Sequence, residues 1–189
     1  GTLYTSGTID FSAGVKANVK DYYQSSGSLT VGEGAELNCS QSFYSAGTVS
    51  NSGTVNVKED TVIKGAFSGG TLVCRGDITA SAELTPDTLE FNGVVSQSFT
   101  NSSSTNVKTL IITVGSVINV SERFSNNCKN LINSKNIILV DDAEFENSQN
   151  SIGSLNVSGV YTVKNGEKLE VNGDLVLKSG STFIVEAVN

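Results

Sequence analysis

The chain has 189 residues, with 12 Lys and Arg against 19 Asp and Glu, and a formal net charge of −7. This acidic balance argues against nucleic acid and anionic membrane surfaces as partners, because both select clustered Lys and Arg. Histidine is absent, which excludes imidazole metal sites and His-dependent nucleophilic triads. No apolar run approaches the roughly 18 residues of a membrane span, so membrane insertion is not expected.

Apolar residues two positions apart mark a strand that returns about every 20 residues along the chain. The pattern begins with Ile9 and Phe11 and continues with Ala17 and Val19. An aromatic residue or Leu then recurs at Tyr23, Phe43, Phe67, Leu84, Phe99, Phe124, Phe145 and Leu169. The strand after each turn is anchored by Leu29, Val49, Leu72, Leu89, Leu110, Ile132, Leu155 and Leu175. We predict that the aromatic positions form one stacked column in the core.

A repeat of this length that cannot bury its own apolar face is typical of a solenoid. Gly and Asn punctuate the strands at positions where turns need positive φ. No stretch has the i, i+3, i+4, i+7 apolar spacing of a helix. The sequence therefore predicts an all-β fold, a right-handed parallel β-helix (β-solenoid) of about eight or nine coils, in which residues 1–189 form a single domain.

The ends of the chain favour a segment excised from a larger protein. The sequence contains no Met and no signal peptide, and it starts in the middle of the repeat at Gly1-Thr2-Leu3. Solenoid ends without a cap present open strand edges. End-to-end self-association is therefore an expected property of the isolated domain.

Three cysteines are too few for a disulfide framework. Cys39 and Cys74 occupy apolar strand positions in rounds that are not adjacent, so we predict two buried, unpaired thiols. Cys128 falls in a polar turn and is the one thiol expected to reach solvent.

With histidine absent, carboxylate chemistry is the remaining route to catalysis. Asp142, Glu144 and Glu146 would project to one side of an extended strand, where they resemble the start of a calcium site. Arg123 and Lys168 align with Glu144 in the preceding and following coils. A polysaccharide lyase presents such a mixture of charges, and so does a charge ladder between stacked coils. We favour the ladder and expect no enzymatic activity; calcium is the only cofactor suggested.

Three lengthened corners rich in Asn and Ser follow Phe99, Phe124 and Phe145, and insertions on one face of a solenoid often mark its binding face. Asn and Ser suit hydroxyl-rich ligands such as glycans, but Asn ladders and Ser-rich turns also occur at β-helix corners for structural reasons, and we favour that structural role. The candidate ligand-binding residues at these corners are Asn101, Asn106, Asn126, Asn127, Asn147 and Asn150. Tyr22 and Tyr44 flank the aromatic column in successive coils, and we expect them to be exposed. They could pair as a small platform for sugar, but we favour the alternative that they only shield a corner.

A family resemblance rests on four segments of the chain. They are Thr88-Leu89-Glu90-Phe91-Asn92-Gly93, Gln97-Ser98-Phe99, Leu110-Ile111-Ile112 and the Gly115-Ser116-Val117 turn. In this pattern the chain resembles the β-solenoid repeats of large secreted and cell-surface bacterial proteins, of the haemagglutinin and autotransporter type. The resemblance implies an extracellular location and a role as a rigid stalk or adhesin. The corner loops between residues 100 and 153 suggest a polysaccharide or a cell-surface glycan as the partner. A lyase-like enzyme and a self-assembling β-helical polymer are the alternatives.

Overall fold

The computed structural model describes residues 1–93 without a gap. Further along the chain it describes residues 96–103, 105, 107, 109–112, 117–120, 124–125, 130–133, 137–139, 145–146, 154–157, 160–163, 174–177, 179–180 and 182–186. Beyond residue 93, side chains are described at 97–103, 105, 107, 111, 175–177, 179–180 and 182–186.

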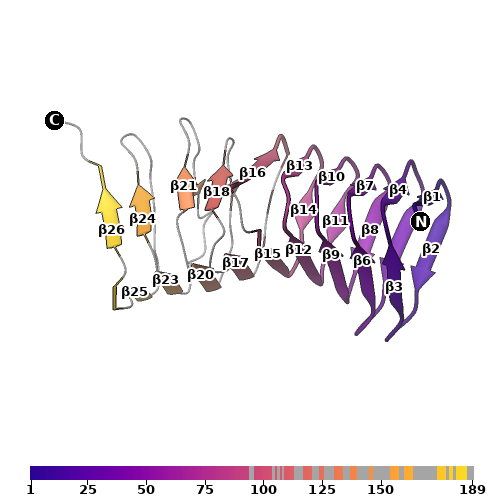
Figure 1. Ribbon diagram of the computed structural model, residues 1–189, viewed down its shortest axis with the longest axis horizontal. Helices are drawn as coiled ribbons and strands as arrows, with labels where there is room; N and C mark the ends of the chain where they lie inside the picture. The colour runs from indigo at the N-terminus through magenta and orange to yellow at the C-terminus, as the bar shows by residue number, and fades with distance from the viewer. Residues whose placement is uncertain are drawn as a thin grey trace.

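The described residues form a parallel β-solenoid in which sheets A and C run along the length of the molecule and sheet B covers the first five coils (Figure 1). Sheet A contains β1 (Leu3–Thr5), β4 (Tyr22–Gln24), β7 (Phe43–Ser45), β10 (Thr61–Ile63), β13 (Ile78–Ala80), β16 (Ser96–Asn101), β18 (Val117–Val120), β21 (Ile137–Leu139), β24 (Val160–Val163) and β26 (Thr182–Val185). Sheet B contains β2 (Thr8–Phe11), β5 (Ser28–Val31), β8 (Thr48–Asn51), β11 (Phe67–Ser68) and β14 (Leu84–Thr85).

Sheet C contains β3 (Lys16–Val19), β6 (Glu36–Cys39), β9 (Thr54–Val57), β12 (Thr71–Cys74), β15 (Thr88–Phe91), β17 (Thr109–Ile112), β20 (Asn130–Asn133), β23 (Ser154–Val157) and β25 (Asp174–Leu177). A two-stranded sheet D pairs β19 (Phe124–Ser125) with β22 (Phe145–Glu146). The described residues contain no helix, and so none that is long and apolar enough to cross a membrane.

The predicted fold class is confirmed, but the predicted number of coils was too high. About five turns, spaced by about 18 residues, are complete in the described part of the chain, against the eight or nine coils predicted. These five turns, from β1–β3 to β13–β15, carry a strand in each of sheets A, B and C. The coils are also unequal in length. The register joins Ala17 to Leu37, Leu37 to Val55 and Val55 to Leu72, so each of these steps along the chain is shorter than the one before it.

The core consists of inward-facing side chains that stack from coil to coil. In sheet C, Leu37, Val55, Leu72 and Leu89 form one fully buried column, and Cys39, Val57, Cys74 and Phe91 form the next. Burial of each such Val, Leu or Phe contributes roughly 1.5–3 kcal/mol, so stacking alone explains why the apolar positions repeat. The parallel backbone ladders between coils satisfy the main-chain polar groups of each strand.

The single aromatic column that the sequence suggested is wrong, because its members face the core from two different sheets. Phe43 in sheet A lies in register with Tyr22 on one side and Thr61 on the other. Phe67 in sheet B lies between Val49 and Leu84. Phe, Leu and Val fill inward positions equally well in either sheet, so residue type alone did not distinguish the two columns.

Buried polar side chains join the coils inside the core. Gln97 is fully buried; its side-chain oxygen accepts from the Gly93 N–H at 2.9 Å, and its Nε2 donates to the carbonyls of Cys74 and Gly76 at 3.2 and 2.7 Å. Ser45 Oγ donates to Gln24 Oε1 at 2.8 Å one coil back. Such bonds satisfy backbone groups at places where the chain turns between sheets.

Candidate functional site

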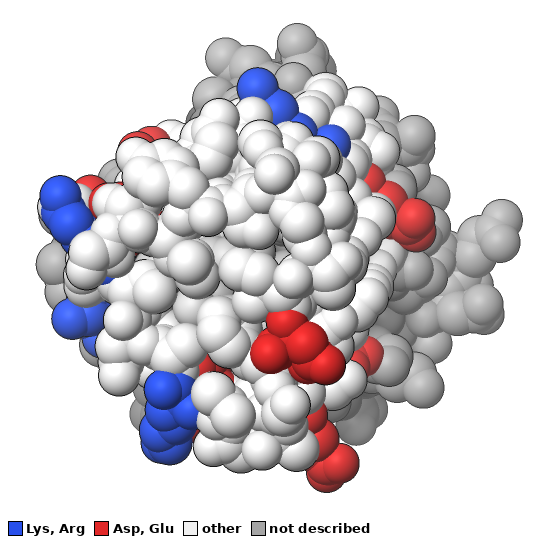
Figure 2. All heavy atoms as spheres, turned by 90° about the vertical axis from the view of Figure 1, so that its right-hand side faces the viewer, with Lys and Arg blue, Asp and Glu red and all other residues white. Residues whose placement is uncertain are grey.

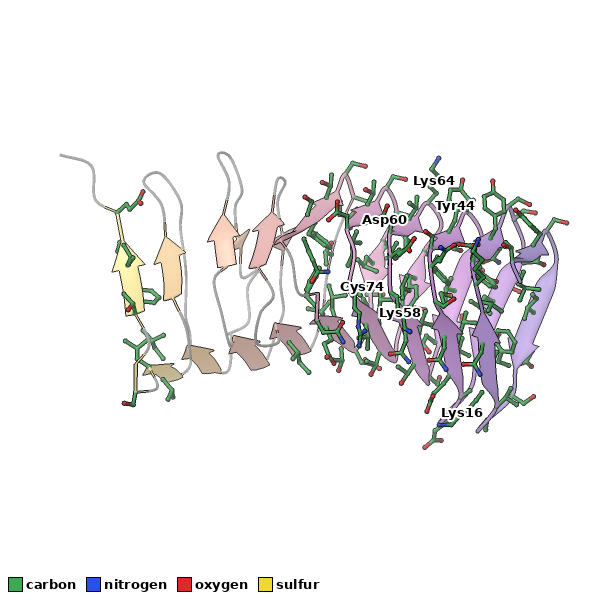
Figure 3. All side chains as sticks on the ribbon, in the orientation of Figure 1. Lys16, Tyr44, Lys58, Asp60, Lys64 and Cys74 are labelled. Carbon is green, nitrogen blue, oxygen red and sulfur yellow. The ribbon has the colours of Figure 1, made fainter. Side chains whose placement is uncertain are left out.

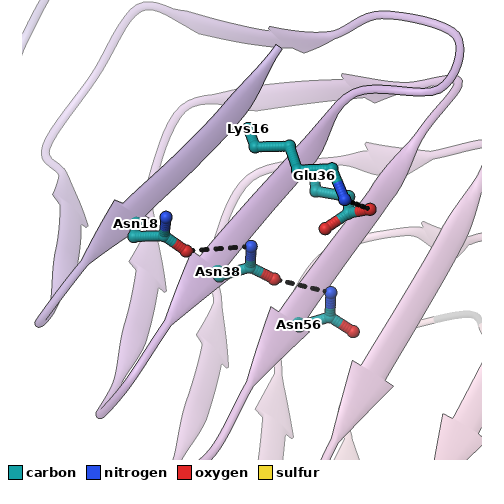
Figure 4. Close-up of polar contacts among 5 residues, drawn as sticks. All are labelled: Lys16, Asn18, Glu36, Asn38 and Asn56. Atoms are coloured by element: carbon teal, nitrogen blue, oxygen red, sulfur yellow. Dashed lines mark hydrogen bonds and ion pairs between the residues drawn. The ribbon is translucent and has the colours of Figure 1, made fainter. Parts of the chain in front are cut away.

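Asparagine side chains form a ladder on the outer face of sheet C (Figure 4). Asn18, Asn38 and Asn56 stand in register on β3, β6 and β9, each between two inward-facing residues of its strand. Asn38 Nδ2 donates to Asn18 Oδ1 at 3.1 Å, and Asn56 Nδ2 donates to Asn38 Oδ1 at 2.8 Å. The ladder holds three amides in one orientation, one coil apart, at the surface.

An ion pair flanks this ladder on the same face. Lys16 Nζ lies 2.7 Å from Glu36 Oε1, between β3 and β6. The hydrogen bond from Lys16 holds the pKa of the Glu36 carboxyl below its ordinary value. The Lys16 side chain is 64% exposed, so the pair contributes little to stability.

The asparagine ladder forms part of a groove along sheet C and the corner that follows it. One hollow of about 490 Å³ is lined by Asn18, Asn38, Asn56, Lys20, Ser40 and Lys58, among others. A second hollow of about 220 Å³ shares Asn38, Asn56 and Lys58 with the first and adds Val73, Arg75 and Asn92. Because the two hollows share residues, we treat them as one groove, the sheet C groove, which spans the first five coils.

Three tyrosines, two of them exposed and Tyr44 half-buried, form a second surface feature on the outer face of sheet A. Tyr4, Tyr23 and Tyr44 lie in register on β1, β4 and β7. The ring centroids of Tyr4 and Tyr23 are 5.6 Å apart with 51° between the planes, and those of Tyr23 and Tyr44 are 4.5 Å apart with 7° between the planes. Lys64 Nζ lies 5.5 Å from the Tyr44 ring centroid, and Figure 3 shows both residues at the outer edge of this sheet.

The tyrosine row covers its own ring faces. Tyr23 and Tyr44 stack on each other, and Lys64 covers the next face, so the row presents mainly ring edges and hydroxyls to a ligand. A sugar ring packs best against an open aromatic face, and of these three residues Tyr4, at 73% exposure, offers the most open one. The sheet C groove is hollow, and its ladder amides keep donor and acceptor capacity beyond the bonds between them, so it is the better candidate for ligand binding.

The expectation that Tyr22 is exposed is wrong. Tyr22 is 1% exposed and stacks on Phe43 inside the core, with ring centroids 5.1 Å apart. Its neighbour Tyr23, assigned to the core from the sequence, is 39% exposed. The register joins Phe43 to Tyr22 rather than to Tyr23, and a shift of one residue moves a strand side chain to the opposite face. Tyr44 does belong to an exposed platform, with Tyr23 and Tyr4 as its neighbours.

Asn101 is the only corner asparagine from the predicted binding face whose side chain the structure describes. It is 3% exposed, and its Nδ2 donates to Thr105 Oγ1 at 2.7 Å while its Oδ1 accepts from the Ser103 N–H at 2.9 Å. Asn101 therefore organises its own turn. The other predicted corner residues, Asn106, Asn126, Asn127, Asn147 and Asn150, lie outside the described residues.

The acidic cluster proposed for calcium also falls largely outside the described chain. Asp142 and Glu144 are not described, nor are Arg123 and Lys168, and Glu146 is described only as the second residue of β22. Within the described part, no group of three or more Cys, Asp or Glu is arranged to hold a metal ion.

The two described cysteines are buried and unpaired, as predicted. Burial raises the pKa of the Cys39 thiol to about 12 and that of the Cys74 thiol to about 12. Thr61 Oγ1 lies 3.3 Å from the sulfur of Cys74, a contact inside the core. Because the thiolate is the nucleophile, thiols held in the neutral form are not suited to catalysis. Cys128 lies outside the described residues.

We compared the chain with known proteins. No protein-family model, curated protein or solved structure matches it. Function is therefore inferred from the geometry of the sheet C groove.

Sequence reasoning missed the asparagines of this groove, although a signal for them was present. Ala17-Asn18-Val19, Leu37-Asn38-Cys39 and Val55-Asn56-Val57 repeat an Asn between two apolar strand residues. An Asn in that position must face outward, and its recurrence in three successive coils predicts a ladder.

Proposed function

We propose that the chain is a rigid β-solenoid module of an extracellular bacterial surface protein, a stalk or adhesive segment that holds a glycan in the sheet C groove. The observation that carries this proposal is the row of Asn18, Asn38 and Asn56 along a hollow that extends over several coils. Amide groups both donate and accept hydrogen bonds, as sugar hydroxyls do.

The geometry favours an extended chain rather than a single small molecule. Neighbouring coils are about 4.8 Å apart, so the groove offers a similar set of polar groups at each coil. That spacing is close to the length of one sugar residue in an extended polysaccharide. A chain lying along the solenoid axis would therefore meet Asn18, Asn38 and Asn56 with successive sugars.

Rigidity supports the same role. β6 and β9 are paired with a strand on each side, and β3, the end strand of the sheet, is paired with β6; the ladder bonds fix the side chains as well. A ligand that binds to such a surface loses its own freedom but orders little of the protein, which favours affinity.

A glycan array tests the proposal with a pair of tryptophan variants. Ser40 is exposed and lines the groove between Lys20 and Lys58, so Ser40→Trp fills the groove without disturbing the core. Ser50 is exposed on β8 of sheet B, and Ser50→Trp is the matched control. We expect the native chain and Ser50→Trp to bind the same glycans and Ser40→Trp to lose them. The absence of any bound glycan, or equal binding by Ser40→Trp, would contradict the proposal.

A further inference from the structure

Cationic side chains recur along one wall of the sheet C groove. Lys20, Lys58 and Arg75 each follow the last residue of a sheet C strand, in the first, third and fourth coils. Backbone bonds place them in equivalent positions, since the N–H of Lys58 donates to Cys39 and that of Arg75 donates to Val57, the residues that end the preceding strands. Ser40 and Asn92 hold the same position in the second and fifth coils.

These three cations form no ion pair with an acid in the described part of the chain. Among the described residues, an ion pair joins Lys16 to Glu36, and Lys20, Lys58 and Arg75 form none. All three are exposed. Asp21, Glu59, Asp60 and Asp77 follow these cations closely in the sequence, but within the described part of the chain it is the cations, and not these acids, that line the two hollows.

Acidic residues at the same corner are turned toward the coil stack. Asp21 accepts from the Thr2 hydroxyl at 2.8 Å and from the Ser42 N–H at 3.3 Å, and these bonds hold the pKa of its carboxyl below the ordinary value. Asp77 accepts from the Ser98 N–H at 2.8 Å in the same manner. Asp60 and Glu59 are exposed beside Lys58, but Figure 3 places Asp60 nearer to sheet A than Lys58.

The charged side chains that line the groove in the described part of the chain are cations. Its lining includes Lys20, Lys58 and Arg75 and no described Asp or Glu. Seen end-on in Figure 2, most Lys and Arg lie toward the left-hand and upper edges, with some Asp and Glu beside them at the left and others to the right and below the centre. The three cations thus form a row beside the asparagine ladder along the groove.

We propose that the occupant of the sheet C groove is a linear acidic polysaccharide, whose carboxylate or sulfate groups contact Lys20, Lys58 and Arg75 while its hydroxyls contact Asn18, Asn38 and Asn56. Lys58 and Arg75 are one coil apart, about 4.8 Å, so they meet neighbouring anionic groups of an extended chain. Arg75 can hold such a group through two parallel N–H donors, and Lys58 acts as a point charge. This inference rests on the proposed function and assigns its substrate class.

Binding to two acidic polymers and one neutral polymer tests the assignment. Polygalacturonate supplies carboxylates, dextran sulfate supplies sulfates, and fully methyl-esterified polygalacturonate has the same backbone as the first without its charges. The test variant is Lys58→Gln with Arg75→Gln. The control variant is Lys16→Gln with Lys64→Gln, which removes two positive charges from residues that do not line the groove. All four side chains are exposed, so unfolding midpoints should stay close to that of the native chain.

We expect the native chain and the control variant to bind at least one acidic polymer with similar affinity, and the test variant to bind it at least about tenfold more weakly. Failure of the native chain to bind either acidic polymer would overturn the assignment, as would equal weakening in both variants. A third result separates this inference from the proposed function. The neutral ester would bind as well as the acid, Ser40→Trp would abolish binding, and Lys58→Gln with Arg75→Gln would leave it unchanged. That result would support glycan binding in the groove and overturn the specificity for acidic polymers.

Discussion

The side-chain amide of Asn56 donates to Asn38 at 2.8 Å, and this bond joins two coils on the surface that we assign to ligand binding. Asn38 repeats the same bond toward Asn18 at 3.1 Å. The middle residue is thus bonded on both sides, whereas Asn18 and Asn56 each have one neighbour in the ladder. The ladder is at once a link between coils and the means by which three amides are held in one orientation.

Substitutions in the ladder should reflect this difference in bonding. Asn38→Ala removes two side-chain hydrogen bonds and Asn56→Ala removes one. With about 1 kcal/mol of net stability for each bond, we expect losses of about 2 and about 1 kcal/mol in the free energy of unfolding. Denaturation in urea measures both. Equal losses for the two variants would mean that the ladder does not act as a chain of bonds.

The tyrosine row on sheet A should contribute to stability rather than to ligand binding. Tyr23 and Tyr44 stack nearly parallel, and such pairs contribute about 0.5–1.5 kcal/mol beyond the area that they bury. A double-mutant cycle with Tyr23→Ala and Tyr44→Ala should give a coupling energy in that range. A coupling near zero would show that the rings do not stack in solution.

Gln97 should be one of the more sensitive polar positions in the described chain. Gln97→Ala leaves the Gly93 N–H and the carbonyls of Cys74 and Gly76 without their side-chain partner in the core. We expect a loss of about 2–4 kcal/mol in the free energy of unfolding. Thr79→Ala, on the exposed face of β13, is the control and should change stability by about 0.5 kcal/mol or less. Similar small losses for both variants would refute the buried network.

The buried thiols make stability depend on alkaline pH. Burial raises the pKa of Cys39 and of Cys74 from the ordinary 9.0 to about 12 in the folded chain. Above pH 9 the unfolded state loses these protons and the folded state keeps them, so the free energy of unfolding falls as pH rises. The stabilisation is complete below about pH 8, and the fall amounts to about 3 kcal/mol for the two thiols by pH 10.

Urea unfolding at a series of pH values measures this slope. A variant with Cys39→Ala and Cys74→Ala starts from a lower stability, because it contains cavities, but its slope between pH 8 and pH 10 should be clearly flatter. Cys128 is kept in both proteins so that its own titration is common to them. Parallel slopes would show that the two thiols are not held in the neutral form.

The fold class could be predicted from the sequence because the alternation of apolar and polar residues within a strand is a local property. Ala17 and Val19, or Leu37 and Cys39, identify a strand with one buried face whatever its neighbours are. The exact register between neighbouring coils could not be predicted from the sequence, because coil length varies. The step from Tyr22 to Phe43 is longer than the step from Val55 to Leu72, and a repeat of fixed length assigns some side chains to the wrong face.

Recognition of the candidate site also depended on the variation in coil length. Lys20, Lys58 and Arg75 fall on one wall only when coils of unequal length are placed in register. The sequence alone drew attention to the longer Asn-rich corners, since insertions are visible without a register. Asn101, the one corner asparagine whose side chain is described, has a structural use instead: an Asn at a turn often bonds its own backbone, as it does here with the Ser103 N–H.

The most direct test of the glycan groove is the response of the asparagine side-chain amides in ¹⁵N-labelled protein. A glycan selected on the array, or polygalacturonate, is titrated while the ¹H–¹⁵N signals of the Asn side chains are followed. We predict saturable shifts for Asn18, Asn38 and Asn56, with the backbone amide signals of Tyr4, Tyr23 and Tyr44 unchanged. Shifts confined to the tyrosines, or to residues outside the sheet C groove, would contradict the account.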